Sequence, residues 1–296
     1  MRNGYIARPE VVSRLLESPR YEVIPTSGVA DRVLEHLPLD VTVAITASPV
    51  KGLGPTLDLA GRLAVEGYHV VPHVTARLVS DDAHLNDIVA RLRAAGIDEI
   101  FVPAGDADPP AGQFTASLDV LRRLTALGDP FSRVGITGYP ETHPAIDDDL
   151  TVQAMWDKRM YANYVVSNLC FDPAALTSWV GRVRRRGVGL PIYIGLAGPV
   201  ERTKLLSIAS KIGVGESTRF LGKHASWFLH MAGPGGYTPE RFLHRAAPAL
   251  EKANSPAAGL HIYTFNQIAE TERWRQRLLG RDESADRTRR PARLAG

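Results

Sequence analysis

Short stretches rich in β-branched and aromatic residues alternate along the chain with longer stretches in which apolar residues recur every three or four positions. The first pattern is typical of buried strands and the second of amphipathic helices. We therefore expect regular alternation of strand and helix along most of the sequence. The expected strands are residues 21–25, 41–46, 69–75, 99–105, 133–139, 163–171, 190–196 and 259–265.

The helical stretches have boundaries that fit helix ends, because several end at Gly and some begin after Pro or Asp. A longer helical insertion, at about 201–252, is expected before the last strand, and a final helix near 268–279 follows it. The other expected helices are residues 29–37, 55–67, 82–96, 116–128, 150–162, 173–187 and 200–213.

Eight strands that alternate with helices predict a parallel sheet, and eight is the number that closes a (β/α)8 barrel. The rival architecture is an open doubly wound sheet, which needs a G-x-G-x-x-G turn after its first strand. The chain has PTSGVAD there, at residues 25–31, and the GPGG of residues 233–236 follows a helical stretch. The predicted fold class is therefore α/β, a single (β/α)8 TIM barrel over residues 1–280.

Charge and composition are those of an ordinary globular protein, with 44% apolar and 23% charged residues among 296. The formal net charge is +3, but residues 281–296 hold five Arg against three acidic residues and few apolar ones. We expect this charged tail to be disordered. The remaining body is nearly neutral, so no nucleic-acid partner is expected.

The single cysteine, Cys170, excludes an intramolecular disulfide and a zinc site built from cysteines. His69, His84 and His224 lack the spacing of metal ligands, and no pattern of two His and one carboxylate occurs, so we expect no metal. The sequence shows no signal-peptide pattern and no apolar run near the ~20 residues of a membrane span. The expected location is the reducing cytoplasm, without a membrane partner.

The first expected strand carries a carboxylate, Glu22, within the sequence YEVIPTSG of residues 21–28. A closed barrel has helices over its outer face, and burying an unpaired charge there costs several kcal/mol. The wet mouth at the C-terminal ends of the strands is the cheaper location, and it is also where barrel enzymes assemble their catalytic residues. We therefore expect Glu22 to face that mouth.

Seven of the eight expected strands carry polar residues near the same end. Structural interpretations remain open for several: Asp106 as a turn former, His143 as a loop residue, and Tyr139 and Tyr263 as core rings. Asn168 favours a functional interpretation, because a buried amide must find hydrogen-bond partners. The full set is Glu22, Thr46, His73, Thr75, Asp106, Tyr139, Glu141, His143, Ser167, Asn168, His261, Tyr263, Thr264 and Asn266.

In these motifs the chain resembles the methylenetetrahydrofolate reductase family from about residue 21 to residue 280. The most distinctive elements have the forms Y-P-E-x-H-P and H-x-Y-T-x-N, and all occur in the order of the family. The motifs are Glu22 before a Pro turn, Pro72-His73-Val74-Thr75, Gly105-Asp106, Tyr139-Pro140-Glu141-Thr142-His143-Pro144, Phe171-Asp172 and His261-Ile262-Tyr263-Thr264-x-Asn266.

The resemblance implies a (β/α)8 barrel that reduces 5,10-methylenetetrahydrofolate to 5-methyltetrahydrofolate, usually by passing hydride from NAD(P)H through bound FAD. It implies that Glu22 is the acid that promotes ring opening at N10 and that Asp106 stabilises the resulting iminium cation, as an ionised carboxylate can. The other implied positions are Asn168, Tyr139, His261 and Tyr263 for the substrate, and Thr46, His73, Ala116 and His143 for the cofactor.

The chain departs from the family at positions that contact the flavin. Ala104 replaces the Arg of an Arg-Gly-Asp sequence, and Gln153, Trp156 and Asp157 align with residues that meet the flavin phosphates. On the folate side, Gln267 replaces an Arg. FAD phosphates need cationic or N–H partners. We therefore expect weak or no FAD binding and direct hydride transfer from NADH or NADPH.

Two other interpretations remain. One is an FAD-dependent reductase of the usual type, in which Lys158 and Arg159 hold the flavin phosphates. The other is a barrel that binds folate without reducing it and acts as a partner subunit or regulator. Retention of both Glu22 and Asp106 favours catalysis, because binding alone does not require an acid and a counter-carboxylate.

Overall fold

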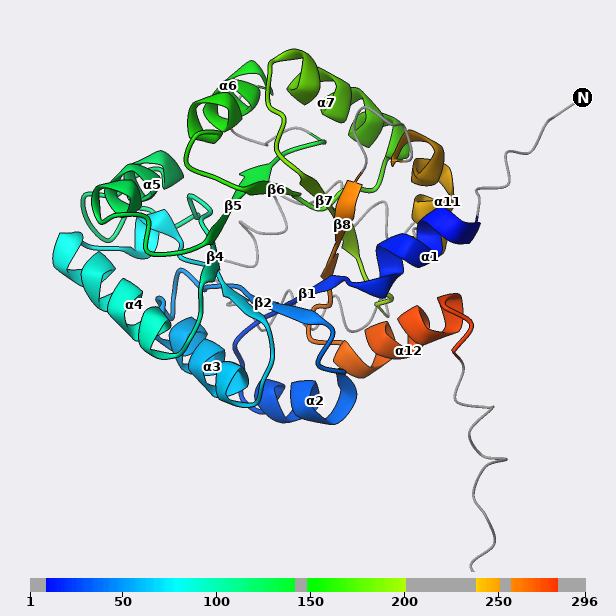
Figure 1. Cartoon of the computed structure of the whole chain (residues 1–296), viewed down its shortest axis with the longest axis horizontal. Coiled ribbons are helices and arrows are strands. Elements are labelled where there is room, and N and C mark those ends of the chain that lie inside the picture. Colours follow the sequence, from blue (N-terminus) through cyan, green and yellow to red (C-terminus); the bar gives the residue numbers. More distant parts are fainter. Residues whose placement is uncertain (1–8, 142–147, 201–237, 251–256, 282–296) are drawn as a thin grey trace, which may run out of the picture.

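Eight parallel strands form a ring with helices around its outside (Figure 1). The computed structural model describes residues 9–141, 148–200, 238–250 and 257–281. Strands pair in the order β3-β2-β1-β8-β7-β6-β5-β4, and a parallel bridge between His73 and Phe101 joins the two ends of this order. The fold is therefore the expected (β/α)8 barrel. Its strands are β1 Arg20–Val23, β2 Thr42–Ile45, β3 Val70–Pro72, β4 Glu99–Phe101, β5 Arg133–Gly138, β6 Tyr164–Ser167, β7 Ile192–Ala197 and β8 Ala257–Tyr263.

The helices cover the outer face of the ring. Helix α1 precedes the first strand and was not predicted; it buries Val11, Val12, Leu15 and Leu16, whose i, i+4 spacing places them on one face. The described helices are α1 Pro9–Glu17, α2 Val29–His36, α3 Gly54–Val65, α4 Asp82–Ala94, α5 Ser117–Ala126, α6 Asp148–Lys158, α7 Pro173–Arg185, α11 Pro239–Leu250 and α12 Ile268–Leu278, with a short 3₁₀ turn, η1 Ala76–Leu78.

Part of the helical insertion predicted at about 201–252 is present as α11, which packs against α7 and α1. The rest of that insertion lies outside the described residues, as do most of the predicted helix at 200–213 and the tail at 282–296. Most strands are shorter than predicted, because their final residues already belong to the loops at the barrel mouth.

Strand β1 shows how the pleat divides side chains between the two faces of the sheet. Tyr21 points outward, and its hydroxyl donates to Glu272 Oε2 of α12 over 2.9 Å. Successive side chains alternate between faces, so Arg20 and Glu22 point into the barrel. There Arg20 meets β4, and Glu22 meets the residue that follows β3.

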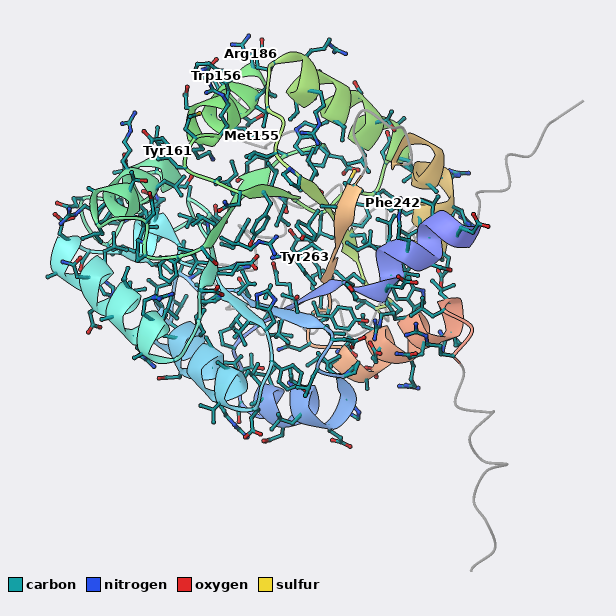
Figure 2. All side chains as sticks on the ribbon, viewed as in Figure 1. Met155, Trp156, Tyr161, Arg186, Phe242 and Tyr263 are labelled. Atoms are coloured by element: carbon teal, nitrogen blue, oxygen red, sulfur yellow. The ribbon has the colours of Figure 1, made fainter. Side chains whose placement is uncertain are left out.

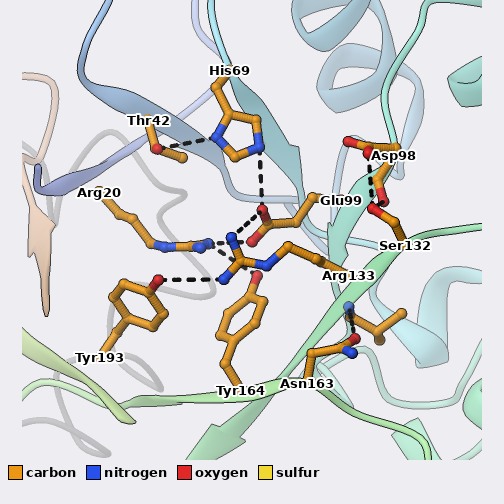
Figure 3. Close-up of polar contacts among 11 residues, drawn as sticks. Arg20, Thr42, His69, Asp98, Glu99, Ser132, Arg133, Asn163, Tyr164 and Tyr193 are labelled. Atoms are coloured by element: carbon orange, nitrogen blue, oxygen red, sulfur yellow. Dashed lines mark hydrogen bonds and ion pairs between the residues drawn. The ribbon is translucent and has the colours of Figure 1, made fainter. Parts of the chain in front are cut away.

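A charged cluster fills the N-terminal end of the barrel, centred on the fully buried Glu99 (Figure 3). Its Oε1 lies 2.6 Å from an Arg20 nitrogen, and its Oε2 lies 3.2 Å from His69 Nε2 and 3.5 Å from an Arg133 nitrogen. Arg20 and Glu99 are the first residues of β1 and β4. The cluster therefore lies at the end of the barrel opposite the mouth where chemistry is expected.

The surroundings of Glu99 stabilise its charged form. Burial alone would raise its pKa, but the hydrogen bond from His69 and the Arg20 guanidinium outweigh that effect and hold the pKa at about 2. The guanidinium of Arg20 also lies 4.4 Å from the ring centroid of Tyr164 and 4.1 Å from that of Tyr193. Favourable cation–π contacts therefore enclose the ion pair.

Replacing Glu99 by Gln should lower the free energy of unfolding at neutral pH by about 3–5 kcal/mol, because it leaves a buried guanidinium without its counter-charge. The deficit relative to wild type should shrink as pH falls from about 4.5 toward 2, since a carboxylate with a lowered pKa loses its stabilising effect over that range. Urea unfolding followed by circular dichroism measures both effects. Glu10→Gln, at an exposed position of α1, is the control, and equal stability of the two variants would contradict the prediction.

Candidate active site

The Glu22 carboxylate lies between two imidazoles near the C-terminal end of β1. Its Oε2 is 3.1 Å from Nε2 of His261 on β8 and 3.8 Å from Nε2 of His73, which follows β3. Both imidazoles are buried, whereas the Glu22 side chain keeps 16% of its surface exposed. Of the three groups, the carboxylate is the most accessible to a ligand that enters the barrel mouth.

His73 is held as a neutral imidazole. Burial lowers its pKa to about 4. The neighbouring Glu22 charge raises this pKa, whereas His261 lowers it. Its ring packs against Phe101, with the centroids 4.7 Å apart. Nε2 of His73 is buried without a hydrogen-bond partner among the described residues. This nitrogen is therefore available to a bound ligand.

Residues that follow β8 hold the backbone around Glu22. Thr264 Oγ1 donates to the Glu22 carbonyl over 2.7 Å. The Asn266 side chain bonds to both backbone groups of Ile24, accepting from its N–H and donating to its carbonyl, each over 2.9 Å. With His261 against the Glu22 side chain, three residues of the H-x-Y-T-x-N motif therefore fix the end of β1.

Two tyrosines connect Glu22 to the loop after β4. Burial and the charge of Glu22 raise the pKa of Tyr263, whose side chain lies in the barrel interior (Figure 2). Burial and the charge of Asp106 raise the pKa of Tyr139 to about 12. Tyr139 in turn raises the pKa of Tyr263. Both phenols therefore remain protonated at neutral pH and can donate hydrogen bonds. The electrostatic effects of Asp106 on Tyr139, and of Tyr139 and Glu22 on Tyr263, indicate that Asp106 lies at the same end of the barrel as Glu22.

The loop that carries Asp106 depends on Gly105. Its backbone has a φ of +89°, and a Cβ at this position would collide with the Thr75 side chain. Only glycine adopts this conformation without strain and leaves that space free. The Gly105-Asp106 pair of the sequence thus has a physical reason: the glycine brings an exposed carboxylate close to the loop after β3.

Asn168 follows β6 and is partly exposed rather than fully buried. Its backbone N–H donates to the Gly138 carbonyl over 2.7 Å, and its side-chain oxygen accepts from the Leu169 N–H over 2.9 Å. Local partners therefore satisfy the side-chain oxygen. The predicted contact between Asn168 and a substrate stays a prediction.

Glu141, from the Y-P-E motif, binds the loop after β6. Its Oε1 accepts from the backbone N–H groups of Phe171 and Asp172 over 2.6 and 2.5 Å, and the Cys170 thiol lies 3.4 Å away. Asp172 in turn caps α7 by accepting from the Ala174 N–H over 2.8 Å. Two motifs far apart in sequence are thus joined by one carboxylate, which gives Glu141 a structural role that the sequence pattern did not specify.

The predicted cofactor positions are spread over the mouth. His73 lies beside Glu22, Thr46 lies partly exposed at the end of β2, and Ala116 lies exposed directly before α5. His143 lies outside the described residues. The structure therefore brings one of the four positions next to the candidate acid and leaves their common role as a prediction.

The residues of α6 that align with flavin-phosphate contacts interact with their own neighbours. Gln153 donates to Asp157 over 2.9 Å and accepts from Arg186 over 2.5 Å. The Arg159 guanidinium lies 3.7 Å from the Trp156 ring centroid and donates to the Trp156 carbonyl over 2.7 Å. Trp156 and Arg186 lie on the outer side of the molecule (Figure 2). The Arg159 guanidinium is therefore engaged by Trp156 through both its ring and its carbonyl.

The other cation, Lys158, is buried, and its Nζ lies 3.3 Å from Ser117 Oγ. Burial lowers the pKa of Lys158 to about 8. At the start of α5, Asp119 Oδ2 accepts from the N–H groups of Thr115 and Ala116 over 3.0 and 2.9 Å. Backbone N–H groups at a helix start suit a phosphate, and here a carboxylate of α5 binds the two N–H groups that lead into the helix.

Two features are absent from the described part of the chain. It holds no group of three or more His, Cys, Asp or Glu side chains arranged to bind a metal ion. None of its helices combines the length and the apolar character needed to cross a membrane.

Comparison with known proteins identifies the family. The family model for methylenetetrahydrofolate reductase matches residues 30–214, more than half of the chain. The chain belongs to the methylenetetrahydrofolate reductase family. The matched region contains Asp106, Tyr139 and Asn168, whereas Glu22 and the residues of β8 lie outside it.

Relatives in this reductase family match part of the chain. The probable methylenetetrahydrofolate reductase (NADH) of Oryza sativa subsp. japonica is 24% identical over 189 residues, which is 56% of this chain and 31% of the rice protein. Methylenetetrahydrofolate reductase 1 of Schizosaccharomyces pombe is 30% identical over 100 residues, which is 32% of this chain and 16% of the yeast protein. The chain therefore spans less than a third of the length of these two relatives.

A solved structure shares the fold of this family member. It is an uncharacterized protein from Clostridium thermocellum that binds two copies of 5-methyl-5,6,7,8-tetrahydrofolic acid. The two proteins superpose with a TM-score of 0.58 at 13% identity, over 91% of this chain and 99% of the other. At this identity the similarity shows a common barrel fold.

Cys170 should react slowly with Ellman's reagent in the native protein, and Glu141→Gln should accelerate the reaction about tenfold or more. Burial and the Glu141 charge raise the pKa of the thiol, and Glu141 also holds the backbone beside it. The rate of thiol modification under native conditions measures the effect. Glu35→Gln, on the surface of α2, serves as control, and equal rates in the two variants would count against the assigned contact.

Proposed function

We propose that this protein reduces 5,10-methylenetetrahydrofolate to 5-methyltetrahydrofolate with hydride from NADH or NADPH and without a tightly bound flavin. Family membership supports the reaction, and the name of the rice relative favours NADH as the first donor to test. The observation that carries the proposal is the accessible Glu22 carboxylate, which buried groups of β3 and β8 fix inside the barrel mouth.

The first chemical step in this proposal is proton donation from the Glu22 carboxyl to N10 of the substrate. The bond between N10 and the methylene carbon then breaks, and its electron pair stays on N10. The product of this step is an iminium cation between N5 and the methylene carbon. A positioned general acid contributes typically about 10²–10⁴-fold to such a reaction.

The second step is hydride transfer to the iminium carbon. Hydride from the reduced nicotinamide converts the methylene group to a methyl group, so charge and electrons balance. Asp106 is the carboxylate assigned to the developing cation, because an oriented charge at the reacting centre lowers the barrier. Tyr139 and Tyr263, both protonated at neutral pH, supply hydrogen-bond donors for the pterin, together with Asn168.

The residues present do not fit FAD. The flavin pyrophosphate needs cations or free N–H groups. Lys158 is buried against Ser117, Arg159 is stacked on Trp156, and Asp119 occupies the start of α5. These contacts favour direct transfer from the nicotinamide to the folate.

Glu22→Gln is expected to lower kcat for NADH oxidation with 5,10-methylenetetrahydrofolate by about 10²–10⁴-fold, because the amide keeps the size of the side chain but has no acidic proton. NADH absorbance under anaerobic conditions follows the reaction, and circular dichroism confirms that the variant is folded. Glu35→Gln is the surface control. A Glu22→Gln enzyme with wild-type turnover would remove Glu22 from the mechanism.

The same assay separates catalysis from mere binding. If the wild-type protein binds the folate but does not oxidise NADH or NADPH in its presence, the protein is a folate-binding barrel and the proposed reduction is wrong.

The purified protein is expected to be colourless and to reduce the folate without added FAD, because Lys158 and Arg159, at the end of α6, are engaged within the protein. Absorbance spectra before and after heat denaturation measure the flavin content. Release of stoichiometric FAD, or turnover only after FAD is supplied, would instead support the flavin-dependent form of the reaction.

A further inference from the structure

The contact between His261 and Glu22 suggests a role that the resemblance does not give. The resemblance assigns His261 to substrate binding, but the structure directs its Nε2 at the Glu22 carboxylate over 3.1 Å. We infer that His261 is a positioning residue that shares one proton with Glu22 and returns it to the carboxyl when substrate covers the site. This inference rests on the proposed reduction.

The geometry holds the two groups together. His261 is only 2% exposed, and its ring stands edge-on to that of Tyr263, with the centroids 5.0 Å apart and an angle of 66° between the rings. Thr264 holds the Glu22 carbonyl over 2.7 Å. The strands β1 and β8 also pair in register, with Tyr21 opposite Ile262. Neither side chain can therefore turn away without disturbing the packed junction of the two strands.

The other titratable groups that face Glu22 do not exchange protons near neutral pH. His73, on the β3 side, is neutral because burial lowers its pKa to about 4. Tyr263, on β8, is protonated because burial and Glu22 raise its pKa. Tyr139 is protonated because burial and Asp106 raise its pKa to about 12. Among the described groups around the carboxylate, His261 is thus the proton partner for Glu22.

One proton on the pair has two arrangements. It forms either a Glu22 carboxylate with a His261 imidazolium, or a Glu22 carboxyl with a neutral imidazole. Water that reaches the partly exposed Glu22 carboxylate favours the charged arrangement, whereas a bound pterin excludes that water and favours the neutral one. Substrate binding therefore moves the proton from Nε2 to the carboxyl oxygen, from which it passes to N10. After product release, the pair regains one proton from solvent.

The pairing can be measured without turnover. With ¹³C-labelled histidine, the His261 resonance is identified by its loss in His261→Asn, and its titration is followed in folate-free protein. Glu22→Gln should change the His261 resonance and its pH dependence, because it removes the carboxylate that His261 Nε2 contacts over 3.1 Å. The surface residue His36 should titrate identically in both proteins. An unchanged His261 midpoint would overturn the inference.

The pH dependence of turnover provides the second test. In His261→Asn the alkaline limb of kcat should move to lower pH, while KM for the folate stays near its wild-type value. Activity should recover toward wild type in acid, where the Glu22 carboxyl is protonated without a partner. A uniform loss at all pH values indicates packing alone, and an unchanged profile indicates no role; either overturns the inference. If the wild-type protein has no reductase activity, the proposed function fails, but the histidine titration still decides the pairing.

Discussion

The junction between the last strand and the first is the interaction on which the barrel mouth depends. The register that places Glu22 opposite Tyr263 joins the first strand to the last and also determines which β8 side chains stand next to the carboxylate. A shift of one residue would send His261 to the outer face and bring a residue made for the helix layer inward. The hydrogen bonds from Thr264 and Asn266 to β1 oppose such a shift. The same pairing of β1 with β8 therefore joins the first and last strands and brings the site residues together.

Strand β1 carries two charged residues with different roles, Arg20 and Glu22, and only Tyr21 lies between them. At the N-terminal end, Arg20 holds Glu99 so strongly that its carboxylate, with a pKa of about 2, has no proton to give at neutral pH. At the C-terminal end, Glu22 contacts two imidazoles, of which His261 is the proposed proton partner. The ion pair suits stability and the imidazole contact suits proton transfer, in agreement with the usual division between the two ends of such barrels.

The strand and helix pattern predicted the fold because each element has its own periodicity, and the count of eight selected the closed ring. The cost of burying an unpaired charge beneath the helix layer also suggested that Glu22 faces the barrel mouth. The pattern did not reveal α1, which precedes the first expected strand. It also gave no sign that Arg20 and Glu99 meet, since they are 79 residues apart and adjacent only across the closed ring. The structural role of Glu141 was missed for the same reason: its partners follow a different strand.

The carboxylate of Asp119 at the start of α5 has a consequence for how this protein could change over time. This carboxylate already binds the two backbone N–H groups that lead into the helix, so a nucleotide phosphate could not use them. Gaining a cation nearby would not suffice to restore such a site, because the resident negative charge would still repel the incoming one. Nucleotide anchoring at this helix would therefore need two coordinated substitutions, one that removes the carboxylate and one that adds a cation.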